Sequence, residues 1–128
     1  MKVSMIELVR ANLAVKEMER QELPYELAAA LVKLKRATQK DFEAFLELEK
    51  KLVRKYAVLD ETGNAALENG HFKFRDLSEA PAYLEERREL EETAVEAAIS
   101  RKAVIPPENI SPQALEALSV FLNFKRKE

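Results

Sequence analysis

Apolar residues recur every three or four positions along most of this chain, which is the spacing of one face of an α-helix. The pattern predicts four helices, at about residues 4–20, 24–57, 79–100 and 112–122. Ser4 with Glu7 forms a capping-box pattern before the first helix. Ser111 followed by Pro112 is typical of a helix start and precedes the last one. The predicted fold class is therefore mainly α.

The second predicted helix is the longest, and its apolar residues alternate at the steps of a heptad pattern. Thr38 and Asp41 are polar breaks in this seam. We expect the interaction residues to be Leu31, Leu34, Phe42, Phe45, Leu52 and Tyr56. So wide an apolar stripe indicates a helix that faces more than one neighbour. Two alternatives remain open: other helices of the same chain cover the stripe, or a second copy or another protein does.

Turn-forming residues interrupt the helical pattern after the second helix. Asn69-Gly70 suits a type I′ turn because both residue types tolerate a positive φ, and the positions that follow alternate between polar and apolar. This predicts a small β-hairpin over about residues 65–75. A short strand is also predicted over residues 102–105, with the hairpin as its candidate partner.

Charge favours an antiparallel pairing of the second and third helices. Residues 33–55 contain eight basic and four acidic residues, whereas residues 76–92 contain two basic and seven acidic ones. Exposed ion pairs contribute little to the free energy of folding. The asymmetry therefore favours the pairing of these two helices more than it stabilises the fold. We therefore predict a single helical domain over residues 1–128. In it, a long antiparallel helical hairpin carries the β-hairpin between its helices, and the two shorter helices pack near its base.

Composition narrows the class of protein. The 128 residues carry a formal net charge of −2, so nucleic acid is an unlikely partner in the absence of a basic excess. The chain has no cysteine, which excludes disulfides and thiolate metal sites. No apolar run approaches the length of a membrane span. These features predict a soluble protein inside a cell.

The polar residues form no recognisable catalytic or metal-binding pattern. His71 is the only histidine, and its place after a predicted turn favours a solvated side chain. The Asp60–Asn64 segment is similar to the start of a calcium-binding loop, but Ala65 and His71 occupy positions that the motif reserves for Gly and Glu. We expect no enzymatic activity, no cofactor and no metal ion.

Short motifs follow one another in a distinctive order: Lys55-Tyr56, then residues 60–63 (DETG), 69–74 (NGHFKF) and 110–118 (ISPQALEAL). This order resembles a family of small proteins of tailed bacteriophages and prophages. The resemblance implies a phage origin and a setting in the bacterial host's cytoplasm or in the virion. It brings no catalytic residues with it.

Together these features predict a non-enzymatic phage-type accessory protein that acts through protein–protein contact or oligomer assembly. A structural or virion role is the first interpretation. The alternative is a host-takeover or anti-defence inhibitor that binds a bacterial protein, and nucleic-acid binding ranks below both. The partner is accordingly a second copy of the chain, another protein, or each of them.

Overall fold

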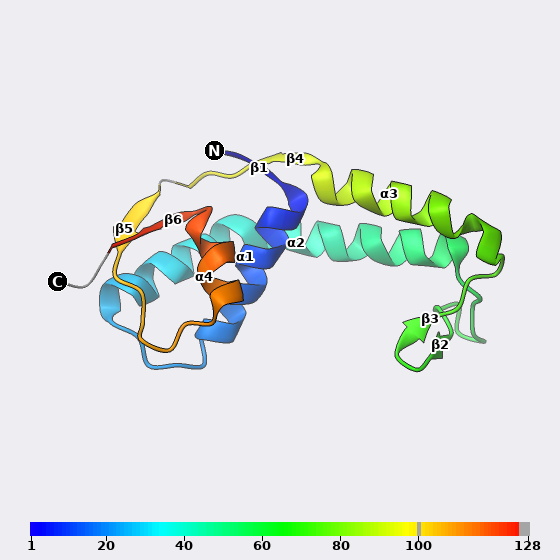
Figure 1. Ribbon diagram of the computed structural model, residues 1–128, viewed down its shortest axis with the longest axis horizontal. Helices are drawn as coiled ribbons and strands as arrows, with labels where there is room; N and C mark the ends of the chain where they lie inside the picture. Colours follow the sequence, from blue (N-terminus) through cyan, green and yellow to red (C-terminus); the bar gives the residue numbers. More distant parts are fainter. Residues whose placement is uncertain (100, 126–128) are drawn as a thin grey trace. The chain divides into compact units, whose positions relative to one another are not determined.

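The computed structural model describes residues 1–99 and 101–125, and helices dominate it (Figure 1). The helices are α1 (Met5–Met18), α2 (Tyr25–Tyr56), α3 (Ala80–Glu92) and α4 (Pro112–Ser119). The predicted mainly α class is confirmed. None of the helices within residues 1–99 and 101–125 combines the length and the apolar character that a membrane span requires.

Contacts divide the chain into two compact units. Unit 1 comprises residues 1–43 and 94–128, and unit 2 comprises residues 44–93. Helix α2 contributes its first part to unit 1 and its second part to unit 2. That both units belong to a single domain stays a prediction.

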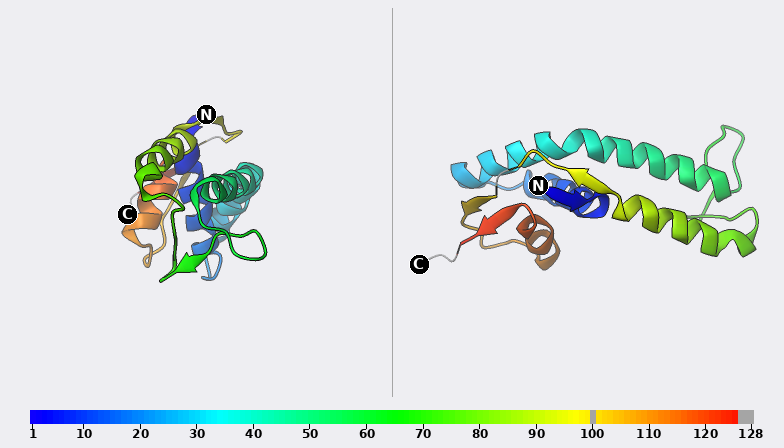
Figure 2. Two further views of the ribbon diagram at one scale, coloured as in Figure 1. Left: turned by 90° about the vertical axis from the view of Figure 1, so that its right-hand side faces the viewer. Right: turned by 90° about the horizontal axis from the view of Figure 1, so that it is seen from above.

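Unit 1 is built on the packing of α1 against α4, which lie side by side in Figures 1 and 2. Two small strand pairs belong to it. Strand β1 (Lys2–Ser4) pairs antiparallel with β4 (Ala94–Glu96), and β5 (Lys102–Val104) pairs parallel with β6 (Leu122–Phe124). Its most deeply buried side chains include Leu8, Val15, Met18, Leu27, Leu34, Leu118 and Phe121.

Side-chain caps explain where α1 and α4 begin. The Ser4 hydroxyl accepts a hydrogen bond from the Glu7 amide, and the Glu7 carboxylate accepts one from the Ser4 amide. Ser111 accepts from the Ala114 amide at 3.1 Å, and a proline occupies the first turn of α4. These bonds satisfy amides that have no partner inside the helix. Both helix starts predicted from the sequence are confirmed.

Unit 2 contains the second part of α2, a β-hairpin, the 3-10 helix η1 (Leu77–Glu79) and α3. The hairpin strands are β2 (Leu67–Glu68) and β3 (His71–Phe72), which pair antiparallel. Asn69 and Gly70 connect them with φ angles of 53° and 80°. Both values are positive, as a type I′ turn requires.

The ends of α3 and α4 and the pairing partner of one strand differ from the sequence prediction. Helix α3 ends at Glu92 instead of continuing to residue 100, because residues 94–96 pair with β1; residue 100 itself lies outside the described residues. Helix α4 ends at Ser119, since residues 122–124 pair with β5. Because β5 pairs with β6, the prediction that residues 102–105 pair with the hairpin is wrong. Strand partners distant in sequence override the helical preference of alanine and leucine.

Candidate functional site

Five of the six expected interaction residues are buried in the chain itself. The exposed fractions of Leu31, Leu34, Phe42, Phe45 and Tyr56 lie between 2 and 7 %. Leu52 is half-buried. The chain thus covers most of the stripe, which is the first of the two alternatives that the sequence left open. A surface for a partner has to be sought among other residues.

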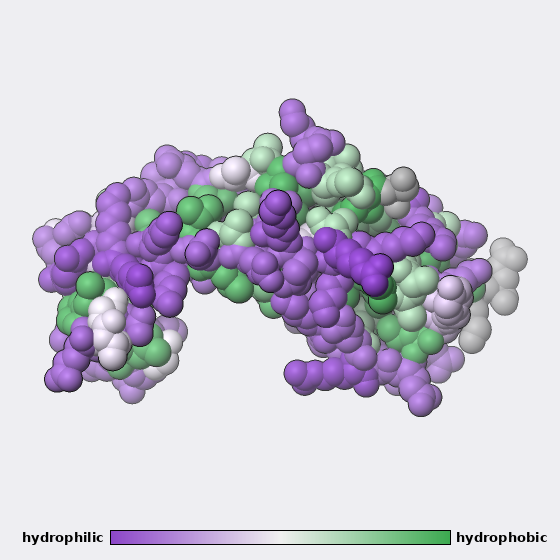
Figure 3. Space-filling view, turned by 180° about the vertical axis from the view of Figure 1, so that it is seen from behind, coloured by the Kyte–Doolittle hydropathy of each residue, from purple (hydrophilic) through white to green (hydrophobic). Residues whose placement is uncertain are grey.

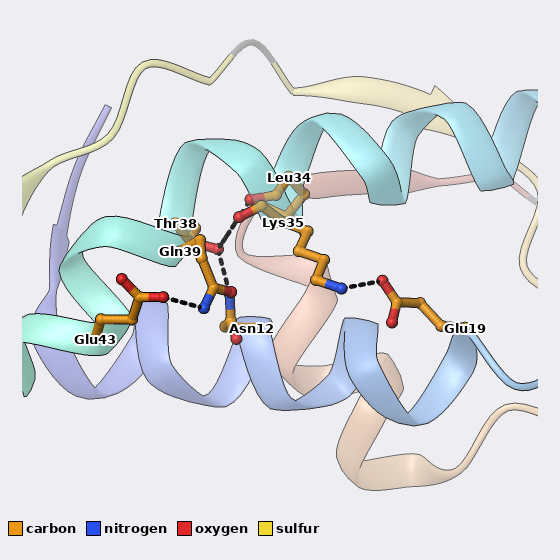
Figure 4. Close-up of polar contacts among 7 residues, drawn as sticks. All are labelled: Asn12, Glu19, Leu34, Lys35, Thr38, Gln39 and Glu43. Atoms are coloured by element: carbon orange, nitrogen blue, oxygen red, sulfur yellow. Dashed lines mark hydrogen bonds and ion pairs between the residues drawn. The ribbon is translucent and has the colours of Figure 1, made fainter. Parts of the chain in front are cut away.

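One polar break in the seam of α2 also belongs to the core (Figure 4). Thr38 is fully buried, and its hydroxyl donates to the Leu34 carbonyl at 2.9 Å and accepts from Asn12 Nδ2 on α1 at 2.9 Å. Asn12 Nδ2 also donates to Gln39 Oε1 at 3.3 Å. Asn12 Oδ1 is the one buried side-chain polar atom of the described residues that has no hydrogen-bond partner. The cluster joins α1 to α2 and is a packing feature.

A surface groove with a mainly apolar lining lies in unit 2 and has a volume of about 470 Å³. We call it the hairpin groove. Three elements line it: α2, the β-hairpin with its flanks, and the start of α3. Its lining residues are Val53, Leu67, Gly70, His71, Phe72, Phe74, Ala80, Tyr83 and Leu84. Figure 3 shows hydrophobic residues at the surface over this hairpin, at the lower left of the view.

Aromatic rings form the wall of the hairpin groove. The centroid of the buried Tyr83 ring lies 5.1 Å from that of Phe72 and 5.5 Å from that of Phe74, with the rings nearly perpendicular. Tyr56 meets Tyr83 in the same way at 5.8 Å. Edge-to-face packing of this kind favours fixed ring positions. The wall therefore needs little ordering when a ligand binds.

Exposed leucines flank this wall. Leu67 is 72 % exposed and Leu84 is 62 % exposed, and both line the hairpin groove. Leu77 of η1 is 76 % exposed but does not line the groove. Contiguous exposed apolar residues of this kind mark binding sites more often than isolated ones do.

Charged contacts hold α3 beside α2 in unit 2. The Glu86 carboxylate accepts hydrogen bonds from Lys55 Nζ at 2.6 Å and from the Tyr56 hydroxyl. The Lys55 ammonium and the Tyr56 hydroxyl lower the pKa of Glu86, while the hydrogen bond to Glu86 raises the pKa of both partners. Arg87 pairs with Glu49 at 2.7 Å.

The Arg87 guanidinium also reaches the groove wall, because it donates to the Tyr83 hydroxyl at 3.3 Å. Its ion pair with Glu49 is half-buried on both sides, so water screens it less than it screens an exposed pair. Arg87 thereby connects the charged contacts between the helices to a ring that lines the hairpin groove. The bond from Arg87 adds one polar contact to the ring contacts of Tyr83.

The remaining polar groups near the hairpin bond to nearby backbone or side-chain groups or face solvent. Asp60 Oδ1 accepts from the amides of Thr62 and Asn64 and from the Thr62 hydroxyl, and these bonds lower the pKa of Asp60. His71 is exposed, as predicted. Within residues 1–99 and 101–125, no three His, Cys, Asp or Glu residues are arranged to hold a metal ion. The groove is suited to binding an apolar side chain.

Sequence reasoning missed the groove residues Leu67, Phe72, Tyr83 and Leu84 as candidates. The alternation of Phe72 with Phe74 was a signal for a strand, and Leu84 stands in an acidic stretch. Neither pattern indicates which apolar side chain stays exposed. Comparison of the chain with protein-family models, with curated proteins and with solved structures finds no match.

Proposed function

We propose that this protein is a non-enzymatic accessory protein that binds another protein through the hairpin groove of unit 2. The observation that carries the proposal is the combination of a fixed aromatic wall with the exposed Leu67 and Leu84 at its rim. An apolar side chain of the partner would insert against Phe72 and Tyr83. Buried apolar anchors supply most of the affinity in such contacts.

In this proposal, the contacts between α2 and α3 hold the hairpin groove in place. In it, α2 and α3 form the long antiparallel hairpin that the sequence predicts, and the groove lies where the chain turns between them. The Lys55–Glu86 and Glu49–Arg87 ion pairs support this arrangement. Sites carried on packed helices keep their geometry better than sites on loops alone.

The setting we propose is that of a tailed phage, either in the virion or in the cytoplasm of its bacterial host. It rests on the resemblance carried by the motifs from Lys55-Tyr56 to the 110–118 segment. Burial of five of the six expected interaction residues weakens the reason to expect self-association through that face of α2. A heterologous partner is therefore the form of the proposal that the exposed residues support best.

Site-specific photocrosslinking tests the proposal. A photoreactive amino acid replaces Leu84 in the full chain, and a matched variant carries it at Leu48, which is 46 % exposed on α2 but does not line the groove. Both are irradiated during infection and in purified particles. We expect one discrete adduct from position 84, absent from position 48 and lost when Leu67→Asp is added.

The origin of the adduct separates the roles. A virion protein in the adduct supports the structural role, and a host protein supports the inhibitor role. Equal adducts from positions 84 and 48 would contradict the groove as the binding site. An adduct of twice 14.6 kDa, the mass of one chain, would replace the heterologous partner by a second copy.

A further inference from the structure

A second groove lies in unit 1, between α1 and α4, and has a volume of about 500 Å³. We call it the α1–α4 groove. Ala14 and Ala114 are buried at its floor, and Leu13, 51 % exposed, stands beside them. The half-buried Ala117 and Val120 continue the apolar lining along α4. Alanines at the floor allow the backbone of a further helix to approach closely.

The rim of the α1–α4 groove is negatively charged. Three carboxylates line it, those of Glu7, Glu17 and Glu116, against one guanidinium, that of Arg10. The Glu7 carboxylate is engaged with Ser4 in the capping box. The side chains of Arg10, Glu17 and Glu116 are exposed, and among the described residues none of them forms an ion pair or hydrogen bond. The groove thus combines an apolar floor with carboxylates that no neighbour neutralises.

We infer that the α1–α4 groove binds a basic amphipathic helix of another protein. Its apolar face would lie against Leu13 and the alanine floor, and its Lys or Arg side chains would lie beside Glu17 and Glu116. A second copy fits less well, because a symmetric contact would place the same acidic rim against itself. Nucleic acid is repelled by the same carboxylates. This inference does not depend on the hairpin groove.

Fluorescence anisotropy with designed peptides tests the inference on the full chain. The probe is a labelled peptide of about 18 residues, with leucines at helical spacing and lysines on both flanks. A companion peptide carries glutamates in place of the lysines. We expect the lysine peptide to bind, the glutamate peptide not to bind, and the affinity to fall as salt screens the charges.

Charge-reversal variants locate the binding site. Glu17→Lys combined with Glu116→Lys should weaken the lysine peptide roughly tenfold, as expected when two rim attractions become repulsions. The matched control is Glu22→Lys with Glu26→Lys, which changes the net charge equally at exposed positions outside this groove. Leu13→Ser should also weaken binding, whereas Leu115→Ser, on α4 but outside the lining, should not. Circular dichroism checks that each variant is folded.

Three results would overturn the inference. The first is equal binding of both peptides, which would indicate unspecific apolar contact. The second is binding of neither. The third is a solution mass of two chains that falls to one in Leu13→Asp, which would assign the groove to a second copy.

Discussion

Asn12 on α1 donates a 2.9 Å hydrogen bond from Nδ2 to Thr38 Oγ1 on α2, and both side chains are fully buried. The Thr38 hydroxyl donates in turn to the carbonyl of Leu34, four residues earlier in the same helix. Burying polar groups in an apolar core costs less when they are hydrogen-bonded, and this pair satisfies Asn12 Nδ2 and the Thr38 hydroxyl. Asn12 Oδ1 has no hydrogen-bond partner among the described residues. The pair therefore sets which turn of α1 lies against which turn of α2.

Thr38→Val tests how much the hydrogen bond between Asn12 and Thr38 contributes to the stability of the protein. The substitution keeps the shape of the side chain but leaves the buried Asn12 amide without its main acceptor, which should lower the free energy of unfolding by about 1–3 kcal/mol. Adding Asn12→Leu removes the stranded group and should recover much of the loss. Urea denaturation measures all three proteins.

Thr93→Val is the matched control for Thr38→Val. The Thr93 hydroxyl also donates to a carbonyl four residues earlier, that of Glu89, but its side chain is exposed. Its free energy of unfolding should stay within about 0.5 kcal/mol of the parent. A Thr38→Val protein as stable as this control would contradict the role of the buried pair.

Glu86 should make part of the stability depend on pH. Lys55 and Tyr56 lower its pKa in the folded protein below its ordinary value of 4.5. At a pH between the folded and the unfolded pKa of Glu86, the unfolded chain binds more protons than the folded chain. The stabilisation by the ionised Glu86 is therefore complete above pH 4.5 and is lost as the pH falls through the lowered pKa. Glu86→Gln should therefore lower the urea midpoint at pH 7, and the difference from the parent should shrink towards pH 3.

Glu89→Gln serves as the control for Glu86→Gln. Glu89 lies on the same helix and is exposed, and in the described residues its carboxylate makes no hydrogen bond to Lys55 or Tyr56. Its urea midpoint should follow that of the parent at every pH. A Glu86→Gln difference of equal size at pH 7 and pH 3 would show that the lowered pKa of Glu86 contributes nothing.

Gly70→Ala should destabilise the hairpin through the backbone alone. No atom lies within 4 Å of the position that an added Cβ would occupy, but the φ angle of 80° is unfavourable for any residue with a Cβ. We expect a loss of about 1–2 kcal/mol in the free energy of unfolding. Asn69→Gly is the control, because glycine accepts the positive φ of that position. Equal stability of Gly70→Ala and the parent would argue against the type I′ turn.

Tyr83→Ala should collapse the aromatic wall of the hairpin groove. The ring is 7 % exposed and contacts Tyr56, Phe72 and Phe74, so its removal should cost about 3–5 kcal/mol. Tyr83→Phe keeps the ring and loses only the hydroxyl, which accepts one long bond from Arg87. It should unfold within about 1 kcal/mol of the parent. A similar loss in both variants would place the stabilisation in the hydroxyl instead of the ring.

Features with a local cause could be predicted from the order of the amino acids alone. Ser4 and Ser111 begin helices because their hydroxyls reach amides three residues later, and both partners lie within one turn of the chain. Asn69-Gly70 forms a turn because those two residues tolerate positive φ. The sequence also identified α2 to within one residue at each end, because residues 25–56 follow a helical spacing and contain neither Gly nor Pro.

Features that depend on a partner distant in the sequence could be found only in the folded chain. Helix α3 ends at Glu92 because residues 94–96 pair with β1 near the N-terminus. The sequence of residues 79–100 does not indicate that pairing. Periodicity likewise shows that a residue is apolar but not what covers it. Phe42 is buried and Leu84 is exposed because the neighbours that exclude water come from other elements, and their placement is a property of the folded chain.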